Sequence, residues 1–447
     1  MKKKFILPII ITPIAATAII ATACGDQSEA QKPSGWIPKE ERVAQIKTVD
    51  LTSVKEEARS QKYVLITDKG DVHDKSFNQS SWEALNQLYD QTGAEVNFIQ
   101  PSTENYTQAY NQALSQGYTV WILSGFTHSA SLKSFIEQNY QTLVDRKIQI
   151  IGVDFSLTGA NALSKQYPYF FGLLFKFDQS AWIVGYATAK YLAYKYPNDA
   201  DKRIVASFAG GDNVGTTRFN TGFAKGVLAY NQDPKNTVKV KHQFSVPLDS
   251  GYETNEKMQT VITSVLSGQY GKTPTVVLPV AGPATGEVLN AYARSQANAD
   301  KLVIGVDVDQ SLSYPDKAGK FLTSITKNIA QAEYDIMTEI LLSAKNSREN
   351  KFLVGHDKSK TFTLEGTFAQ GWAGFTKSHL TNAADRAKMD QFLTDAENLF
   401  KSKSQAFVDY ISDDSKATEG GQQSYTTVTD LLKAVTDLIN QTNTTQQ

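Results

Sequence analysis

The chain has 447 residues, of which 41% are hydrophobic and 20% charged, with a formal net charge of −1 and a single cysteine. This length is sufficient for two domains, each with its own core. A charge so close to zero, without a visible stripe of Lys and Arg, argues against nucleic acid as a partner, because binding a phosphate backbone requires clustered cations. A single cysteine also excludes an internal disulfide.

The N-terminal residues carry the pattern of an export signal. Three lysines precede an apolar run over residues 5–23, which ends in small residues immediately before Cys24. This ending suits signal-peptidase cleavage and resembles a bacterial lipoprotein signal, with Ala21 where Leu is usual. We therefore expect a signal peptide over 1–23 and a lipid-modified, palmitate-bearing Cys24 that holds the protein on the extracellular face of the cell membrane. An uncleaved membrane anchor is the alternative, since the run is long enough to span a bilayer.

Residues 24–60 are expected to form a tether. The stretch 25–39 is polar and contains Pro33, Gly35 and Pro38. This composition is typical of a flexible linker.

From Lys62 onward, short β-branched runs alternate with amphipathic segments of helical length. This alternation indicates βαβ units and a parallel sheet. In the first helix, Ser76 occupies the position of an N-cap. Strands are expected at 63–67, 96–99, 120–123 and 148–153, and helices at 76–92, 105–116 and 131–140.

A second series of the same kind follows. Its predicted helices are 180–196, 218–230, 255–266 and 284–296, and its strands are 204–208, 238–242, 275–280 and 302–306. The fold class is therefore α/β, with two doubly wound lobes joined by a hinge. In open α/β sheets the carboxyl ends of the strands face the ligand, so we expect a binding cleft between the lobes.

The remaining chain is predicted to be mainly helical. A helix is expected from 330 to 345, then a hairpin of strands 352–354 and 361–364, then helices at 383–401 and 426–439. The last residues are Thr, Gln and Asn and are expected to be disordered.

These patterns define the expected domain boundaries. We assign 61–177 and 303–327 to the N-terminal lobe, 178–302 and 328–370 to the C-terminal lobe, and 371–447 to a C-terminal helical extension with a disordered end.

The segment from Thr67 to Trp82 is the most informative part of the chain. Asp68 ends the first strand, a glycine-containing loop follows, and Phe77 and Asn78 open the next helix. A carboxylate, an aromatic face and an amide at one sheet edge suit a flat polar ring, because stacking on an aromatic side chain contributes about 1–3 kcal/mol. The alternative is structural, with Phe77 in the core and Asp68 capping its own loop.

This segment resembles the start of the basic membrane protein family of substrate-binding lipoproteins, the purine nucleoside receptor A type that serves ABC transporters. The likeness extends over about residues 62–345 and includes three later motifs, at 219–227, 304–310 and 322–327. It implies a periplasmic-binding-protein-like fold of type I.

The resemblance also implies a role for each matching residue. Asp68 and Asn78 would contact a nucleobase, Phe77 would stack on it, and Asp307 with Lys327 would hold the ribose hydroxyls. Asp307 ends a predicted buried strand, and a charged hydrogen bond from its carboxylate to a diol contributes about 1.5–3 kcal/mol. An Asp307–Lys327 ion pair without a ligand is the structural alternative.

Two further positions end predicted strands on the side of the cleft. Asp154 and residues 124–126 are expected to line the cleft or to contact the ligand. Gly282 occupies the place of the family's glycine-rich turn close to the sugar.

The family has a second stacking phenylalanine in its other lobe. Phe244 is our candidate for this role, with Phe208 and Phe219 as competitors.

Enzymatic motifs are incomplete. Gly271-Lys272-Thr273 would need a glycine at Leu266 to form a phosphate loop. The pair Ser324 and Lys327 lacks the other motifs of penicillin-binding enzymes, and the five histidines show no metal-ligand spacing. We therefore expect no catalytic residue, metal or cofactor.

The sequence predicts an extracytoplasmic lipoprotein that binds a nucleoside, a purine nucleoside in preference, and delivers it to the permease of an ABC transporter. We expect a monomer that works by hinge closure. Two alternatives from other classes remain open, a nucleoside-cleaving hydrolase and a surface adhesin or antigen without a small-molecule ligand.

Overall fold

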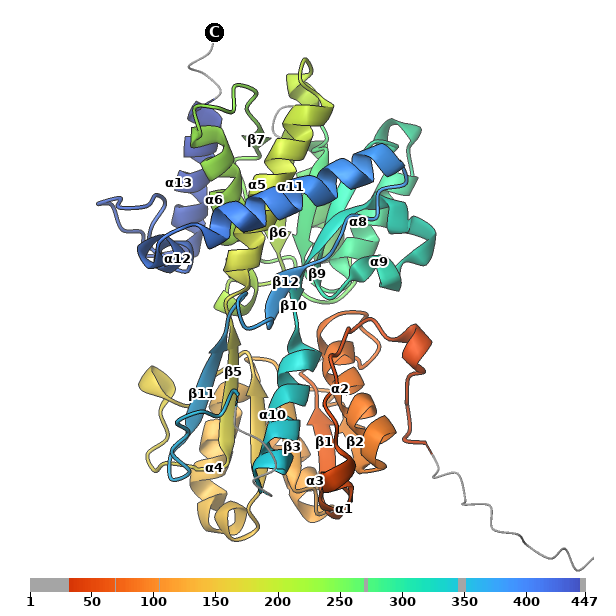
Figure 1. Ribbon diagram of the computed structural model, residues 1–447, viewed down its shortest axis with the longest axis vertical. Helices are drawn as coiled ribbons and strands as arrows, with labels where there is room; N and C mark the ends of the chain where they lie inside the picture. Colours follow the sequence, from red (N-terminus) through yellow and green to blue (C-terminus); the bar gives the residue numbers. More distant parts are fainter. Residues whose placement is uncertain (1–31, 69, 104, 269–271, 345–350, 443–447) are drawn as a thin grey trace, which may run out of the picture. The chain divides into compact units, whose positions relative to one another are not determined.

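The computed structural model describes residues 32–442 except 69, 104, 269–271 and 345–350 (Figure 1). The predicted signal peptide and Cys24 lie outside the described residues, as does the end of the chain after 442. From Pro33 onward the chain forms a compact unit that contains two six-stranded sheets. We refer to the sheet nearer the N-terminus, with its helices, as lobe 1 and to the other as lobe 2.

Lobe 1 contains a parallel sheet of strand order β11-β5-β4-β3-β1-β2. Its strands are β1 (Lys62–Ile66), β2 (Glu95–Ile99), β3 (Val120–Ser124), β4 (Gln149–Val153), β5 (Phe170–Phe175) and β11 (Phe362–Gly366). Strands β1, β3 and β4 are almost entirely buried, as expected of a sheet covered by helices on both faces. The strand order reverses at β1, which is where ligands bind in such sheets.

The helices of lobe 1 follow the predicted alternation with small shifts. They are α1 (Lys55–Ser60), α2 (Phe77–Thr92), α3 (Tyr106–Ser115), α4 (His128–Asp145) and α10 (Ile329–Ala344), with 3-10 turns η1 (Lys39–Glu41), η2 (Thr52–Val54) and η3 (Gly159–Asn161). Gly93, with φ of 73°, ends α2 as its C-cap, a left-handed conformation that glycine adopts without steric cost.

Lobe 2 repeats this architecture with strand order β12-β10-β9-β8-β6-β7. Its strands are β6 (Ile204–Ala209), β7 (Lys241–His242), β8 (Val276–Val280), β9 (Leu302–Asp307), β10 (Phe321–Lys327) and β12 (Ala373–Phe375). Among the strands that the structure describes in this sheet, β12 alone is antiparallel to its neighbour, β10.

The helices of lobe 2 are α5 (Phe177–Lys195), α6 (Val214–Gln232), α7 (Glu256–Ser267), α8 (Ala284–Ala293) and α9 (Gln310–Ser313), with 3-10 turns η4 (Ala200–Lys202), η5 (Gln296–Asn298) and η6 (Pro315–Lys320). Helices α5 and α6 pack closely because Gly222 faces the backbone of Asp178. A Cβ at Gly222 would lie 2.4 Å from the Asp178 carbonyl oxygen.

The predicted lobe boundaries are wrong after residue 302. Strand β9 pairs with β8 of lobe 2 and β10 pairs with β9, so 303–327 does not belong to the N-terminal lobe. Residues 328–370 do not belong to the C-terminal lobe, because α10 packs on α2 and β11 pairs with β5. The reason is that a strand's sheet is decided by its hydrogen-bonding partner, which alternation along the chain does not reveal.

The chain crosses between the lobes three times, after β5, after β10 and after β11. The crossings are joined by backbone hydrogen bonds, from Lys176 to Gly366 (2.7 Å) and from Asn328 to Trp372 (2.9 Å). These segments therefore form the hinge that the sequence predicts between the lobes.

The described part of the predicted tether is packed on lobe 1. Ile37, Val43, Leu51 and Val54 are buried, and the Glu83 carboxylate of α2 accepts from the backbone amides of Val43 and Ala44. From residue 33 on, the expectation of a free tether is therefore wrong, because hydrophobic residues spaced among the polar ones find partners on α2.

Within the described residues, the C-terminal extension packs on lobe 2 and contains helices, as predicted, and also strand β12, which was not predicted. Helices α11 (Ala383–Lys401), α12 (Gln405–Ile411) and α13 (Val428–Gln441) lie against α5 and α6 (Figure 1). The predicted hairpin is wrong, since residues 352–354 form no strand and β11 pairs with β5, almost two hundred residues earlier (Figure 1).

Candidate functional site

The loop between β1 and α2 is organised by a carboxylate that the sequence analysis did not single out. The Asp74 side chain accepts from the backbone amides of Ser76 (2.9 Å), Asn78 (2.9 Å) and Gln79 (3.1 Å). It thereby caps α2, and the Ser76 side chain makes no capping bond. Burial raises the pKa of Asp74 to about 6, although these hydrogen bonds act in the opposite direction. The sequence signal for this cap was that Asp74 lies only two residues before Ser76.

Asp68 and Asn78 are brought together as predicted. The Asn78 amide nitrogen donates to Asp68 Oδ1 (3.0 Å) and to Asp74 Oδ2 (3.0 Å). The Asn78 carbonyl oxygen is buried and has no hydrogen-bond partner within the described residues. An acceptor held in a fixed orientation is thus next to the Asp68 carboxylate, as required for reading the edge of a polar ring.

Asp154 and Asp307 occupy corresponding places in the two lobes. Asp154 directly follows β4 and Asp307 ends β9, and each is preceded by Ile-Gly-Val. Both have positive φ, 68° and 66°, a conformation that costs energy for residues other than glycine and is concentrated at functional sites. The repeated Ile-Gly-Val-Asp is the sequence signal that relates the two positions.

Lys327 is buried at the end of β10 and pairs with Asp154. The structural alternative, an ion pair of Lys327 with Asp307, is therefore not the contact observed, and Asp307 instead accepts a hydrogen bond from the Ser76 hydroxyl (2.7 Å). The Lys327 ammonium lies over the rings of Phe77 (5.0 Å), Phe177 (5.0 Å) and Phe175 (5.5 Å). Cation–π attraction to these three rings helps to fix the position of the ammonium.

The carboxylates outnumber the cation in this group of residues. Burial raises the pKa of Asp68, Asp154 and Asp307, and the Lys327 ammonium acts in the opposite direction on the last two. Asp68 and Asp307 also raise the pKa of Asp154. A ligand that supplies N–H and O–H donors therefore suits this site, and an anion does not.

Gly282 lies close to the start of α2. A Cβ at this position would be 3.3 Å from the Ser76 Cβ, and the Gly282 carbonyl oxygen accepts from Gln310 (3.2 Å). The glycine thus permits a close approach of the two lobes. Gly125 likewise leaves room for a neighbouring side chain, because a Cβ at Gly125 would lie 3.2 Å from Asp68 Oδ2.

Phe244 lies away from these residues. It borders a hollow of about 380 Å³ against α13, together with Leu432 and Lys433. Its competitors are in the core, where Phe208 is fully buried and Phe219 stacks on Phe177. The proposed second aromatic is therefore not brought to the site, because 244–246 follows the edge strand β7 and packs against the C-terminal extension.

Tyr252 is an aromatic of lobe 2 that lies near the site. Its ring is packed over Gly210 and Gly211, its hydroxyl accepts from Asn213 (2.9 Å), and the residue is 45% exposed. Burial of the hydroxyl raises the pKa of Tyr252, and the carboxylates of Asp68 and Asp154 act in the same direction. Nothing in the local sequence distinguishes it from the other tyrosines.

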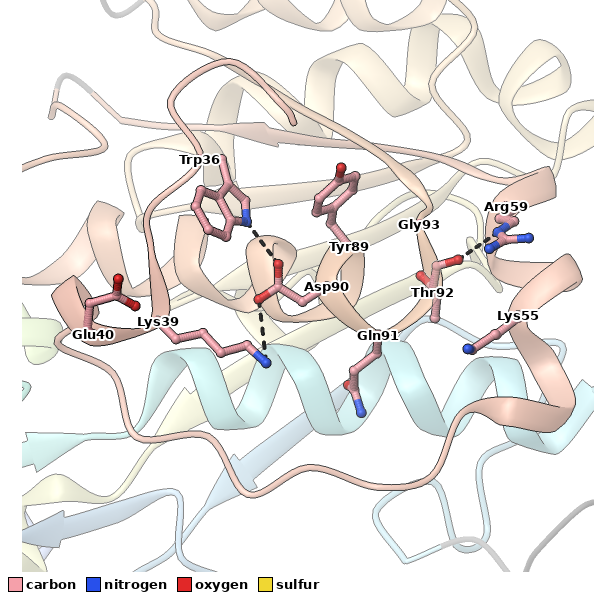
Figure 2. A pocket seen from close by; sticks show the side chains of 10 residues that line it. All are labelled: Trp36, Lys39, Glu40, Lys55, Arg59, Tyr89, Asp90, Gln91, Thr92 and Gly93. Atoms are coloured by element: carbon pink, nitrogen blue, oxygen red, sulfur yellow. Dashed lines mark hydrogen bonds and ion pairs between the residues drawn. The ribbon is translucent and has the colours of Figure 1, made fainter. Parts of the chain in front are cut away.

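A larger hollow lies elsewhere, where the N-terminal segment meets α2 (Figure 2). Its volume is about 560 Å³, and its lining includes Trp36, Lys39, Arg59 and Tyr89. Figure 2 shows the Trp36 indole donating to Asp90, at 2.9 Å. It contains none of the predicted site residues.

Within the described residues, no group of three or more His, Cys, Asp or Glu side chains is placed to hold a metal ion. In the same part of the chain, no helix is both long and apolar enough to cross a membrane.

Known proteins resemble this chain in sequence. The model of the family described as ABC transporter substrate-binding protein PnrA-like matches residues 61–357. The ABC transporter nucleoside-binding protein BmpA of Lactococcus lactis subsp. cremoris is 29% identical over 350 residues, covering 74% of this chain and 86% of that protein. The CD4+ T-cell-stimulating antigen of Listeria monocytogenes is 26% identical over 320 residues, covering 69% and 74%.

A solved structure shares the fold. A solute-binding protein of an ABC transporter system from Aeropyrum pernix K1 has a TM-score of 0.59 and 18% identity, covering 86% of this chain and 98% of its own. The predicted two-lobed fold is thus confirmed, and the family match extends over well over half of the sequence. The chain belongs to the PnrA-like family of ABC transporter substrate-binding proteins.

Proposed function

We propose that this protein binds a nucleoside between its two lobes and delivers it to the permease of an ABC transporter. The observation that carries the proposal is the meeting of Asp68, Phe77 and Asn78 of lobe 1 with Asp307 and Lys327 of lobe 2. The name of the Lactococcus relative, a nucleoside-binding protein, supports the choice of ligand.

Each group has a proposed role. Phe77 stacks on the base, and Asp68 and Asn78 read its polar edge. The Asn78 side-chain oxygen, which has no hydrogen-bond partner among the described residues, is one acceptor. Asp307 accepts from the ribose hydroxyls. Lys327 donates to the same sugar and balances part of the carboxylate charge. A purine is favoured over a pyrimidine because its larger ring system gains more from stacking between Phe77 and an aromatic of lobe 2. Tyr252 is our candidate for this aromatic of lobe 2, because it is close enough to Asp68 and Asp154 for their charges to affect it.

Transport needs no covalent chemistry at this site. Ligand binding shifts the equilibrium between open and closed lobes, and the permease recognises the closed form. The protein is proposed to act as a monomer without catalytic residues or cofactor. It would be held outside the cell by lipid on Cys24.

The test is calorimetric titration of the full chain in detergent with inosine, guanosine, cytidine, free hypoxanthine and ribose. We expect purine nucleosides to bind more tightly than the free base, the pyrimidine nucleoside or ribose. Recovery of intact inosine after incubation would exclude hydrolysis, and absence of heat with every nucleoside would contradict the proposed function.

The first site prediction concerns Asp307. Asp307→Ala should weaken purine nucleoside binding about tenfold or more, since a charged hydrogen bond contributes about 1.5–3 kcal/mol, and should change binding of the free base little. The matched control is Asp309→Ala, because Asp309 caps α9 through Ser311 instead of facing the site. Equal affinity of Asp307→Ala and the parent would refute the sugar assignment.

A further inference from the structure

The two lobes meet through a pair of reciprocal contacts. The Ser76 hydroxyl, at the N-terminus of α2 in lobe 1, donates to Asp307 Oδ2 at the end of β9 in lobe 2, at 2.7 Å. Gly215, in the first turn of α6 in lobe 2, faces Asp154 at the end of β4 in lobe 1. A Cβ on Gly215 would lie 3.2 Å from Asp154 Oδ2.

The two contacts are equivalent in the repeated architecture of the lobes. In each, a buried carboxylate with positive φ follows an Ile-Gly-Val strand end and approaches the N-terminus of a helix from the opposite lobe. A helix N-terminus carries partial positive charge that favours a carboxylate. Each contact can therefore stabilise the arrangement in which the lobes are together.

Ser76 is available for this contact because it does not cap its own helix. Asp74 accepts from the amides of the first turn of α2, including that of Ser76. The absence of a side chain at Gly282 leaves room for the Ser76 Cβ, 3.3 Å from where a Cβ of Gly282 would be.

The neighbouring residue adds two bonds between the lobes. The Lys75 ammonium donates to the Ser313 carbonyl oxygen (3.2 Å), and the Ser313 hydroxyl donates to the Lys75 carbonyl oxygen (3.2 Å). Lys75 has φ of 58°, so the loop accepts backbone strain while it makes these bonds.

We propose that Ser76 and Gly215 are positioning residues that determine closure of the lobes. Ser76 orients the Asp307 carboxylate by holding one oxygen, which leaves the other for the ligand. Gly215 has no side chain, so the Asp154 carboxylate, which is paired with Lys327, can pack against the first turn of α6. The identity of the ligand in this inference rests on the proposed function. The contacts that close the lobes do not depend on it.

The first experiment compares Ser76→Ala with Ser80→Ala. Ser80 lies one turn further along α2, and its hydroxyl accepts from the Ala330 amide of the same lobe. Titration of the full chain with inosine should show about tenfold weaker binding for Ser76→Ala, near-parental binding for Ser80→Ala, and partial rescue in Ser76→Thr. If Ser76→Ala binds inosine as tightly as the parent, Ser76 does not position Asp307. If the parent itself binds no nucleoside, the proposed function fails, and closure is tested as follows.

The second experiment measures closure without reference to ligand identity. Spin labels on Gln138→Cys in α4 and Thr263→Cys in α7, in a full chain with Cys24→Ser, report the separation of the lobes. Both positions are exposed. Gly215→Ala and Ser76→Ala should each shift the distance distribution of the ligand-free chain toward longer separations than in the parent. Distributions that coincide with the parent's in both variants would overturn the proposal.

Gly215→Ala also separates closure from stability. Alanine favours a helix over glycine, so the melting temperature of this variant should equal or exceed that of the parent while the lobes open and inosine binding weakens. A purely structural role of Gly215 would instead lower the melting temperature and leave the distance distribution of the folded protein unchanged.

Discussion

Lys327 shows how partners within the site are chosen in three dimensions. The motifs place Asp307 and Lys327 within twenty residues of each other, yet the ammonium pairs with Asp154, far earlier in the chain. Asp307 instead receives the Ser76 hydroxyl from the other lobe. Motifs along the chain predicted which residues to consider, but the packing of the two lobes decided which of them touch.

Glu333 is a buried acid with a consequence for stability. It is fully buried on α10, where it accepts from the Ser81 hydroxyl of α2 at 2.7 Å. Burial raises the pKa of Glu333 from 4.5 to about 8, and the hydrogen bond from Ser81 acts in the opposite direction.

The pH dependence follows from that shift. Between pH 4.5 and about 8 the folded protein retains a proton on Glu333 that the unfolded chain has released. The free energy of unfolding therefore falls as pH rises, by about 1.4 kcal/mol per unit. Glu333→Gln keeps a neutral acceptor for Ser81 and removes this dependence. Urea unfolding at pH 5.5 and 8 should show the variant gaining on the parent by on the order of 3 kcal/mol, and parallel pH profiles would contradict the assignment.

At the scale of elements, the start of helix α2 contains three features together: the Asp74 cap, two residues of the candidate site and the Ser76 contact with lobe 2. Its first turn carries Phe77 and Asn78, and Asp74 holds both the helix amides and the Asn78 side chain. The sequence analysis named Ser76 as the cap, because serine is a frequent N-cap residue. The observed φ of −154° and ψ of −108° at Ser76 direct its hydroxyl to Asp307 instead.

The cap gives a prediction for α2. Asp74→Ala should lower the free energy of unfolding by about 1–2 kcal/mol and should also weaken ligand binding, because Asn78 loses one of its two anchors. Asp71→Ala is the control, since Asp71 accepts from His73 within the exposed part of the loop. Urea unfolding and inosine titration measure the two effects, and a loss of stability with unchanged binding would show that Asp68 alone suffices to hold Asn78.

At the scale of the whole molecule, the C-terminal extension is part of lobe 2. The Lys225 ammonium of α6 donates to the carbonyl oxygens of Tyr410 (2.9 Å), Ile411 (3.2 Å) and Asp413 (2.8 Å) at the end of α12. The Asn440 side chain of α13 exchanges two hydrogen bonds with the His242 backbone. It thereby covers the edge strand β7, which would otherwise be open to pairing with another chain.

Because α13 packs on lobe 2, a substitution in α13 should lower the stability of the folded protein as a whole. Ile439 is fully buried, so Ile439→Ala should lower the free energy of unfolding by about 2–5 kcal/mol. Lys433→Ala, on the exposed side of α13, should change it by no more than about 0.5 kcal/mol. Fluorescence of the tryptophans and far-UV circular dichroism should report one shared transition. A separate early transition for α13 would show that the extension unfolds independently.

The sequence by itself determined the alternation of strands and helices, the α/β class and the family, because hydrophobic periodicity and short motifs are local properties. It also predicted that Asp68, Phe77, Asn78, Asp307 and Lys327 belong to the site, since strand ends and helix starts can be found along the chain. The tertiary structure decided the sheet of β9, β10 and β11, the pairing of Lys327 with Asp154, and the place of Phe244 beside α13. Strand pairing and contacts between lobes join residues far apart in the chain, and their geometry exists only once both cores have formed.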